Sequence, residues 1–213
     1  MKTIGVRKLK QMLLQAADEI VKNEPYLTEI DAIIGDADHG IGMKRGFGSV
    51  RGMLLESEFE TVDEMLKSVG IELVKTMGGA SGVIFGTLFI GGISKLGGGD
   101  TVSLAELAAY FDEGAEAIQR RGKARAGQKT MLDALIPAVE ALKQSAGSGA
   151  DMKEALEKAY EMALKGVEAS KMMQPKVGRS KNFQEAAIGL PDPGAISTSL
   201  IFKALRDGIN LPD

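Results

Sequence analysis

The feature that most constrains this fold is a helical spacing of apolar residues, which recurs along almost the whole chain. The first example is the set Val6, Leu9, Leu13, Ala16 and Ile20. Side chains three or four positions apart share one face of an α-helix, so each such set predicts an amphipathic helix. Eight segments show this pattern, and the only β-like run, residues 32–34, is too short to build a sheet. The sequence therefore predicts an all-α protein.

The expected helices are separated by mostly short connections. They begin near Val6, Met43, Val62, Gly79, Ser103, Thr130, Asp151 and Gly194. Short connections favour antiparallel neighbours, so we expect a barrel or bundle of eight antiparallel helices, forming a single domain over residues 1–213. One connection, residues 174–193, is long and carries several basic residues. Long loops inside compact domains are usually functional or disordered.

Composition excludes several classes of site. The chain has no Cys, which rules out disulfides, thiolate zinc sites, iron–sulfur clusters and a cysteine nucleophile. Its single His rules out a metal site with several imidazole ligands. The formal net charge of −3 is unlike the basic footprint of a nucleic-acid-binding protein, so we expect no nucleic-acid partner.

Residues 76–94 carry no charge, and the segment is nearly long enough to span a membrane. A membrane span and a buried core helix are the two interpretations. The densely apolar part is only residues 83–93, and glycines interrupt the whole segment, which favours a buried core helix. Residues 1–15 lack the continuous apolar stretch of a signal peptide. We therefore expect a cytoplasmic protein with no membrane partner.

Three acidic residues and the only His lie within nine positions, at the expected start of the second helix: Asp31, Asp36, Asp38 and His39. Gathering like charges is costly unless a cation lies between them. Carboxylates without thiolates suit a hard divalent cation, Mg²⁺ before Zn²⁺. The alternative is helix capping, because Asp38 is a good N-cap and Asp36 favours the helix dipole. Asp31 and the adjoining glycines favour the metal site.

Two further segments precede helices. Residues 78–82 (Gly-Gly-Ala-Ser-Gly) open the fourth expected helix, where small residues can expose backbone N–H groups to phosphate. Close helix packing through Gly82 and Gly86 is an equally good explanation. Residues 192–194 (Asp-Pro-Gly) precede the last helix and either contribute a carboxylate and free N–H groups or form a plain turn and cap. Neither a Walker-type loop nor a Rossmann fingerprint is present.

These three segments stand at the starts of the second, fourth and eighth expected helices. Alternate helix starts lie at the same end of an up-and-down bundle, so the carboxylates, the glycine loop and the basic long loop would converge on one rim. In phosphoryl transfer, metal ions neutralise the phosphates, N–H groups orient them, and Arg stabilises developing charge. The placement therefore predicts a Mg-nucleotide site.

Five motifs, in this order along the chain, resemble those of the nucleotide-binding L subunits of dihydroxyacetone kinases. They are Gly35–Gly40 with Met43 and Gly46, Gly78–Gly82, Gly127–Asp133, Gly178-Arg179, and Asp192–Gly194. The resemblance covers essentially the whole chain. It implies a barrel of eight antiparallel helices that holds ADP or ATP at one rim through two Mg²⁺ ions.

The resemblance also implies roles for individual residues. The three expected Mg²⁺ ligands are Asp31, Asp36 and Asp38, and the expected catalytic residues are Asp36, Asp38 and Arg179. The expected nucleotide contacts are His39, Gly40, Ile41, Gly42, Ala80, Ser81, Gly122, Met131, Arg179, Asp192, Pro193 and Gly194. Gly42 departs from the family pattern, which commonly has Asn there; glycine offers only its backbone N–H.

The same resemblance implies how the work is divided among chains. A separate K subunit would hold dihydroxyacetone, and a phosphohistidine on an M subunit, charged from phosphoenolpyruvate, would rephosphorylate ADP bound to this chain. We also expect a homodimer. Three alternatives remain open at this point: an L subunit serving another ketose such as erythrulose or using free ATP, a nucleotide-loaded module that contacts a transcriptional regulator, and a helical scaffold without a ligand.

Overall fold

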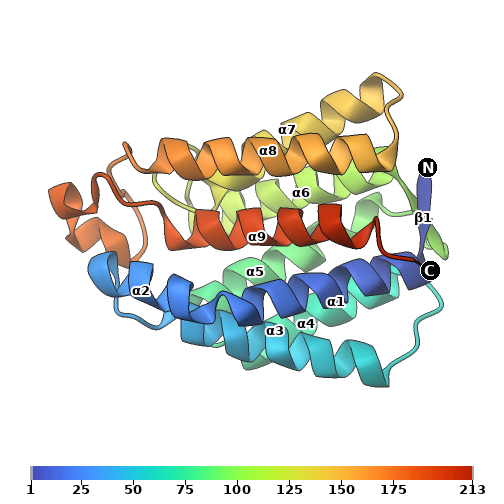
Figure 1. Ribbon diagram of the computed structural model, residues 1–213, viewed down its shortest axis with the longest axis horizontal. Helices are drawn as coiled ribbons and strands as arrows, with labels where there is room; N and C mark the ends of the chain where they lie inside the picture. Colours follow the sequence, from blue (N-terminus) through green and yellow to red (C-terminus); the bar gives the residue numbers. More distant parts are fainter. Residues whose placement is uncertain (1, 213) are drawn as a thin grey trace.

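A computed structural model describes residues 2–212, and within that range the chain forms nine α-helices and two short strands (Figure 1). The prediction of an all-α protein is confirmed. The helices are α1 (Val6–Lys22), α2 (Glu24–Ile34), α3 (His39–Glu56), α4 (Val62–Thr76), α5 (Gly79–Gly91), α6 (Leu104–Gly122), α7 (Leu132–Gly147), α8 (Met152–Ser170) and α9 (Pro193–Gly208). All except α2 run lengthwise and alternate in direction along the chain.

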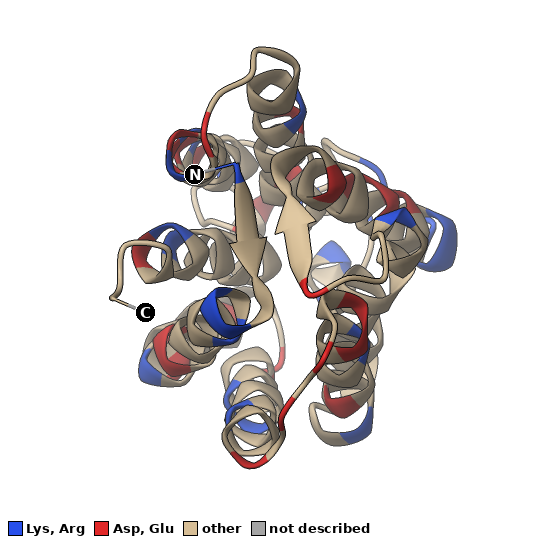
Figure 2. Ribbon diagram, turned by 90° about the vertical axis from the view of Figure 1, so that its right-hand side faces the viewer, with Lys and Arg blue, Asp and Glu red and all other residues tan. Residues whose placement is uncertain are grey.

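These eight lengthwise helices form a closed ring. Each packs against the next one in the chain, with α1 followed by α3, and α9 returns to pack against α1. Figure 2 looks along the helices and shows the charged residues mainly on the outward sides of the ring. The inward sides supply a continuous apolar core that includes Met12, Phe47, Leu135 and Phe202. The expected barrel of antiparallel helices is therefore present.

Helix α2 is the ninth helix, and the prediction of only eight was wrong here. Residues 32–34, read from the sequence as β-like, form its last turn. Its buried residues are Leu27, Asp31 and Ile34, at helical spacing. The stripe is hard to recognise in the sequence because its middle member is a carboxylate rather than an apolar side chain.

A two-stranded antiparallel sheet closes one end of the ring, although the sequence predicted no strand. Strand β1 (Thr3–Gly5) pairs with β2 (Thr101–Ser103), and Ile4 lies opposite Val102, both buried. Three residues are too few to show a period-two pattern. The pairing depends on tertiary contacts instead, since the Val6 amide following β1 also donates to the Asp100 carbonyl at 2.8 Å.

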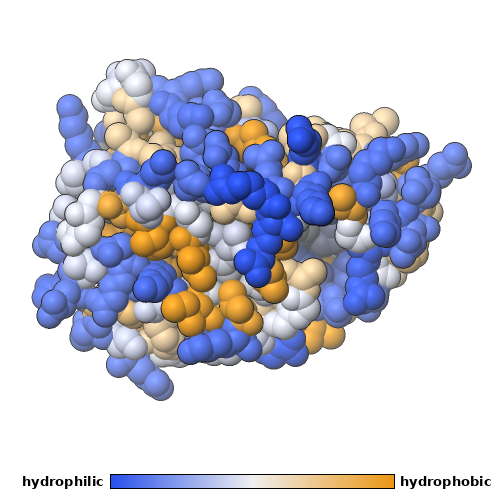
Figure 3. All heavy atoms as spheres, turned by 180° about the vertical axis from the view of Figure 1, so that it is seen from behind, coloured by the Kyte–Doolittle hydropathy of each residue, from blue (hydrophilic) through white to orange (hydrophobic). Residues whose placement is uncertain are grey.

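The apolar segment that required a membrane test is α5, which packs between α4 and α6. A Cβ built on Gly86 would lie 2.9 Å from the Gly70 carbonyl oxygen, so these two glycines allow the backbones of α4 and α5 to approach closely. No helix within residues 2–212 is long and apolar enough to cross a membrane. Some apolar side chains do face outward, including Ile71 and Val74 on α4 and Ile90 on α5. Figure 3 shows such a cluster, ringed by polar groups, on the face behind that of Figure 1.

The long connection between α8 and α9 is not structureless. It contains two short 3₁₀ helices, η2 (Arg179–Asn182) and η3 (Gln184–Ala187), and α9 begins at Pro193. The connection lies at the end of the ring opposite the sheet, beside α2. We call residues 171–192 the Arg179 loop.

Candidate functional site

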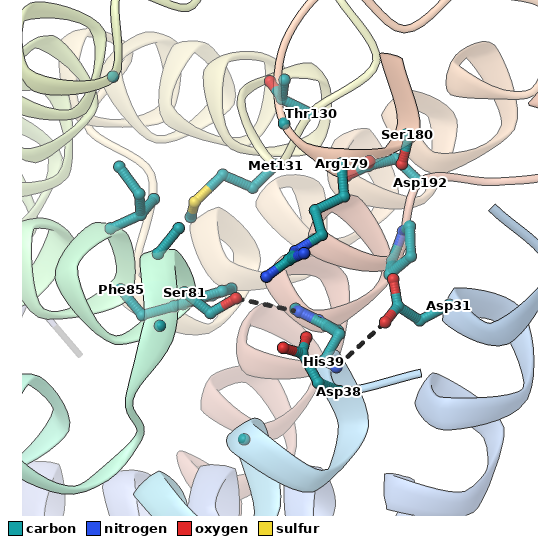
Figure 4. A pocket seen from close by; sticks show the side chains of 18 of the residues that line it. Asp31, Asp38, His39, Ser81, Phe85, Thr130, Met131, Arg179, Ser180 and Asp192 are labelled. Carbon is teal, nitrogen blue, oxygen red and sulfur yellow. Dashed lines mark hydrogen bonds between the residues drawn. The ribbon is translucent and has the colours of Figure 1, made fainter. Parts of the chain in front are cut away.

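The end of the ring opposite the sheet contains a cavity of about 610 Å³. Helices α3, α5, α7 and α9 all begin there, and the Arg179 loop lies across it (Figure 4). The aspartate segment, residues 78–81 and residues 192–194 all line it, so the expected convergence on one rim is confirmed. The volume lies within the range of ordinary small-molecule and cofactor sites.

The three aspartates form a compact group of oxygen donors. One carboxylate oxygen from each of Asp31, Asp36 and Asp38 lies within 4.8 Å of the others. Asp31 is buried on α2, whereas Asp36 and Asp38 are exposed in the connection to α3. Three carboxylates without nitrogen or sulfur ligands fit a hard cation such as Mg²⁺. Helix α2, which the sequence did not predict, thus supplies the first member of the group.

Asp38 occupies the N-cap position of α3, but its side chain makes no capping hydrogen bond. The amide of His39 is bonded instead by Asp31, whose Oδ2 accepts at 3.1 Å. Burial raises the pKa of Asp38, and a hydrogen bond and repulsion from Asp36 raise it further, while Arg179 opposes them. The capping explanation therefore fails for Asp38, and its carboxylate remains available to a cation.

The connection between Asp36 and Asp38 is held in an unusual conformation. Ala37 has a φ of 61°, in the left-handed region that residues with a side chain rarely adopt. Arg179 reaches this connection from the other side of the cavity, with its Nε 2.8 Å from Asp36 Oδ2. In Figure 4 its side chain extends from the loop into the cavity. A strained backbone conformation persists only where the surrounding structure holds it in place. Such conformations are concentrated at active and ligand-binding sites.

His39 links the starts of three helices. Its Nε2 lies 2.8 Å from Ser197 Oγ on α9, and its Nδ1 lies 3.4 Å from Ser81 Oγ on α5. The imidazole is buried, and burial is the main cause that lowers its pKa. A neutral, doubly hydrogen-bonded ring is suited to positioning Ser81 at the cavity wall.

The glycines around α5 divide into two groups, one that lines the cavity and one that packs against α4. Gly78 and Gly79 line the cavity with φ values of 77° and 60°, and no side chain caps the helix start. Gly82 and Gly86 instead pack against α4. The start of α5 therefore lines the cavity without a side-chain cap, and the backbone N–H groups of such a helix start suit an anion. Arg45 supports this turn by donating to the carbonyls of Thr76 and Met77.

The wall opposite the aspartates is largely apolar. It is formed by Ile84, Phe85, Ile118, Gly122, Ala124, Met131, Leu132 and Val177. Gly122 ends α6 and Met131 precedes α7, which places both of these predicted nucleotide contacts on this wall. An apolar wall facing an anion site suits a ligand with an apolar ring at one end and phosphates at the other.

Residues 192–194 begin α9 and serve as the plain cap that the sequence also allowed. Asp192 Oδ2 accepts the Ala195 amide at 2.8 Å. The carboxyl group is buried, which raises its pKa to about 7. All three residues nevertheless line the cavity.

One of the predicted nucleotide contacts, Gly40, does not line the cavity. Gly40 is buried, and a Cβ there would lie 2.2 Å from Thr28 Oγ1 on α2. Ile41 does line the cavity and is 52% exposed at the rim. Gly42 also lines it, and a Cβ there would meet Met77 at ordinary contact distance.

Lys129 and Arg45 also line the cavity, although the sequence gave neither an individual role. Lys129 stands inside the Gly127–Asp133 motif, which was the available signal. Arg45 had no signal, because a basic residue on a helix is most often solvated surface.

The comparisons with known proteins agree with this geometry. A family model for the DAK2 domain matches residues 33–207. The ADP-binding subunit DhaL of the PEP-dependent dihydroxyacetone kinase of Escherichia coli K12 is 37% identical over 91% of this chain and 92% of its own length. DhaL of the PTS-dependent dihydroxyacetone kinase of Lactococcus lactis is also 37% identical, over 89% and 91%.

More distant similarities extend to longer proteins. A D-erythrulose kinase of Mycolicibacterium smegmatis is 30% identical over 97% of this chain but only 36% of its own length. The crystal structure of the dihydroxyacetone kinase from C. freundii in complex with AMP-PNP and Mg²⁺ superposes with a TM-score of 0.75 at 24% identity. It covers 93% of this chain and 33% of that longer one. This structural likeness supports the fold.

Proposed function

The chain belongs to the DAK2-domain family of dihydroxyacetone kinase ADP-binding subunits, and on that premise we propose that it is the nucleotide-carrying subunit of a phosphoenolpyruvate-dependent dihydroxyacetone kinase. The observation that carries the proposal is the position of three carboxylates, within 4.8 Å of one another, in one cavity with the start of α5, which no side chain caps. This combination offers a cation site and an anion site side by side, as a Mg-nucleotide requires.

The residues divide into three groups of proposed roles. Asp31, Asp36 and Asp38 would hold two Mg²⁺ ions, which neutralise phosphate charge. The starts of α3 and α5, with Ser81, would bind the phosphates, and the wall around Met131 and Gly122 would hold the adenine. Arg179, already beside Asp36, would stabilise the charge that develops during transfer. When bound, the nucleotide supplies the chemistry, because ADP receives a phosphoryl group and ATP gives it to a ketose.

Partners follow from this role. We propose that residues 1–213 act as one nucleotide-binding domain in the cytoplasm, with an M subunit as phosphoryl donor and a K subunit that presents dihydroxyacetone. No His on this chain need carry phosphate, since His39 is buried and bonded to two serines. The homodimer and the contact with a transcriptional regulator stay predictions, to be tested by light scattering and by pull-down with a purified regulator.

The decisive experiment is native mass spectrometry of the purified chain, followed by acid release of any bound nucleotide. We expect ADP and two Mg²⁺ ions per chain. A chain that is empty but binds added Mg-ATP would support an exchangeable nucleotide and direct use of ATP. A chain that neither retains nor binds Mg-ADP or Mg-ATP would contradict the proposal.

A second ketose is favoured by one specific observation, the similarity to the D-erythrulose kinase. The sugar would be selected by the partner that binds it, since every side chain assigned above serves the nucleotide. Assays of dihydroxyacetone and erythrulose with the cognate K subunit would distinguish the two substrates.

A further inference from the structure

Lys129 is the one lysine whose side chain is fully enclosed in the described part of the chain, being only 1% exposed. Its Nζ donates to the carbonyl of Ser170 at 2.6 Å and to the carbonyl of Leu190 at 2.5 Å. Burial lowers its pKa, and the charges of Asp192 and Asp133 oppose that shift. A buried ammonium group is costly, and a lysine used only for packing could be replaced by an apolar residue of similar size.

The two acceptors stand at the two ends of the Arg179 loop. Ser170 is the last residue of α8, where the loop departs, and Leu190 lies two residues before the N-cap of α9, where it returns. One side chain therefore fastens both ends of the loop. Two further hydrogen bonds support the same base, from the Asp192 amide to Ser170 Oγ and from the Gly189 amide to the Lys171 carbonyl.

Lys129 itself belongs to the turn that carries the apolar wall. Its φ is 58°, and the side chain of Asp133 fixes the turn by accepting the amides of Gly127 and Thr130. Met131 follows directly and lines the cavity. The loop and the turn are also joined by the Lys176 amide, which donates to the Gln128 carbonyl at 3.2 Å.

We propose that Lys129 is a positioning residue that couples the two walls of the cavity. Its ammonium fastens the Arg179 loop to the Met131 turn, so that the loop stays closed over the Asp36 side while the turn holds the opposite end of the ligand. The proposal rests on the nucleotide site proposed above. On this proposal, the retention of nucleotide depends on the Lys129 side chain, although that side chain donates its hydrogen bonds to backbone carbonyls.

The test uses the full chain with Lys129→Met, which keeps the length of the side chain but cannot donate, and Lys129→Arg, which can. Lys176→Met is the matched control, because that exposed lysine is on the same loop and its Nζ contacts only Gln174 among the bonds of the described residues. The probe is a fluorescent Mg-ADP analogue released by excess Mg-ADP. We expect Lys129→Met to release it roughly tenfold faster, because charge-assisted hydrogen bonds are lost. Lys129→Arg should recover part of the difference, and Lys176→Met should behave as wild type.

Coupling is tested by adding Arg179→Ala to each background. If Lys129 positions Arg179, Arg179→Ala should speed release in wild type and in Lys176→Met, but add little in Lys129→Met. The proposal would be overturned if the two substitutions multiplied the release rate independently. It would also be overturned if Lys129→Met released the nucleotide analogue at the wild-type rate. A wild-type chain that binds no nucleotide would instead defeat the proposed function.

Amide hydrogen exchange without nucleotide keeps the proposal testable if Lys129→Met is too unstable to assay. Ser170→Ala removes the acceptor of the Asp192 amide at the same base, together with one hydrogen bond from Ser170 Oγ to the Val167 carbonyl within α8. We expect faster exchange confined to residues 171–190 in Ser170→Ala, and to a greater extent in Lys129→Gln. Exchange that rises equally throughout α7 and α8 in both variants would show that these residues support the helices rather than the loop.

Discussion

The same number of lengthwise helices start at each end of the ring, but the two ends differ in how the first turns of these helices are capped. At the sheet end, Thr61, Ser103 and Asp151 each cap a helix with a side-chain oxygen, and only α1 starts without such a cap. At the cavity end, only Asp192 caps its helix from the N-cap position. The first amides of α3 and α7 are accepted by side chains outside that position, Asp31 Oδ2 and Thr130 Oγ1, and the start of α5 has no side-chain cap. Uncapped N–H groups at a helix start need another partner. The contrast indicates that the start of α5 is open to a ligand at the cavity end, whereas three of the four helices at the sheet end are stabilised by their own N-cap side chains.

The largest expected effect comes from removing the metal-binding carboxylates at the cavity end. The double substitution Asp36→Asn with Asp38→Asn should weaken Mg-ADP binding at least about 100-fold, because two charged oxygen ligands are lost. In EDTA the same variant should melt at a higher temperature than wild type, because repulsion between the two carboxylates is removed. Titration calorimetry and thermal melts measure the two results.

Asp151→Asn is the matched control, since it alters an aspartate N-cap at the sheet end and keeps an acceptor oxygen. Its Mg-ADP affinity should equal that of wild type. Unchanged nucleotide binding in the double variant would contradict the assignment of the metal site.

The next effect concerns pH and the one capped helix at the cavity end. Because burial raises the pKa of Asp192 to about 7, the folded state binds its proton more readily than the unfolded chain, whose carboxyl has a pKa near 3.8. Stability from this group therefore rises as the pH falls from 8 to 6, by about 1.4 kcal/mol, and is lost as the pH rises through 7. Lys129 and Asp133 are the charged groups that face it.

Asp192→Asn should remove that slope while an amide oxygen still caps Ala195. The measurement is the difference in unfolding free energy between the two proteins in urea at pH 6 and at pH 8. Equal slopes for wild type and variant would show that Asp192 stays ionised throughout.

A smaller effect is expected when an N-cap residue whose side chain caps its helix is compared with one whose side chain makes no capping hydrogen bond. Ser103→Ala removes the half of a capping box in which Ser103 Oγ accepts the Glu106 amide, and should destabilise the protein by about 1 kcal/mol without changing nucleotide affinity. Asp38→Ala should leave the unfolding free energy of the nucleotide-free protein at or above that of wild type, because its side chain caps nothing. Equal losses from both substitutions would remove the distinction between the ends.

The smallest effect concerns Gly42, a position at which the sequence resemblance leads us to expect Asn. A side chain at this position meets Met77 only at ordinary contact distance, so Gly42→Asn should fold and gain at most about 0.5 kcal/mol from reduced backbone freedom. It should also slow nucleotide release if the amide reaches the ligand. Gly48→Ala, on the same helix with open space around it, controls for helix propensity alone.

The sequence predicted those parts of the molecule that depend on local pattern. Periodic apolar residues located the eight lengthwise helices, and the alternation of helix ends brought Asp36, Ser81 and Asp192 to one rim. The sequence did not locate α2, because Asp31 interrupts the apolar stripe of that helix. It did not locate the sheet either, because three-residue strands form only after distant segments have packed. The role of Lys129 was equally hidden, since its partners are backbone carbonyls 41 and 61 residues away.

The sheet end also gathers the two ends of the described chain. The Lys2 carbonyl accepts the Leu104 amide, and the Leu211 carbonyl accepts Lys8 Nζ, so both termini are tied beside the strands and away from the cavity (Figure 1). A protein attached to a surface through either terminus would present the cavity to the solution. Sensor chips and single-molecule tethers could therefore follow the arrival of other proteins at the open rim without the linker standing in their way.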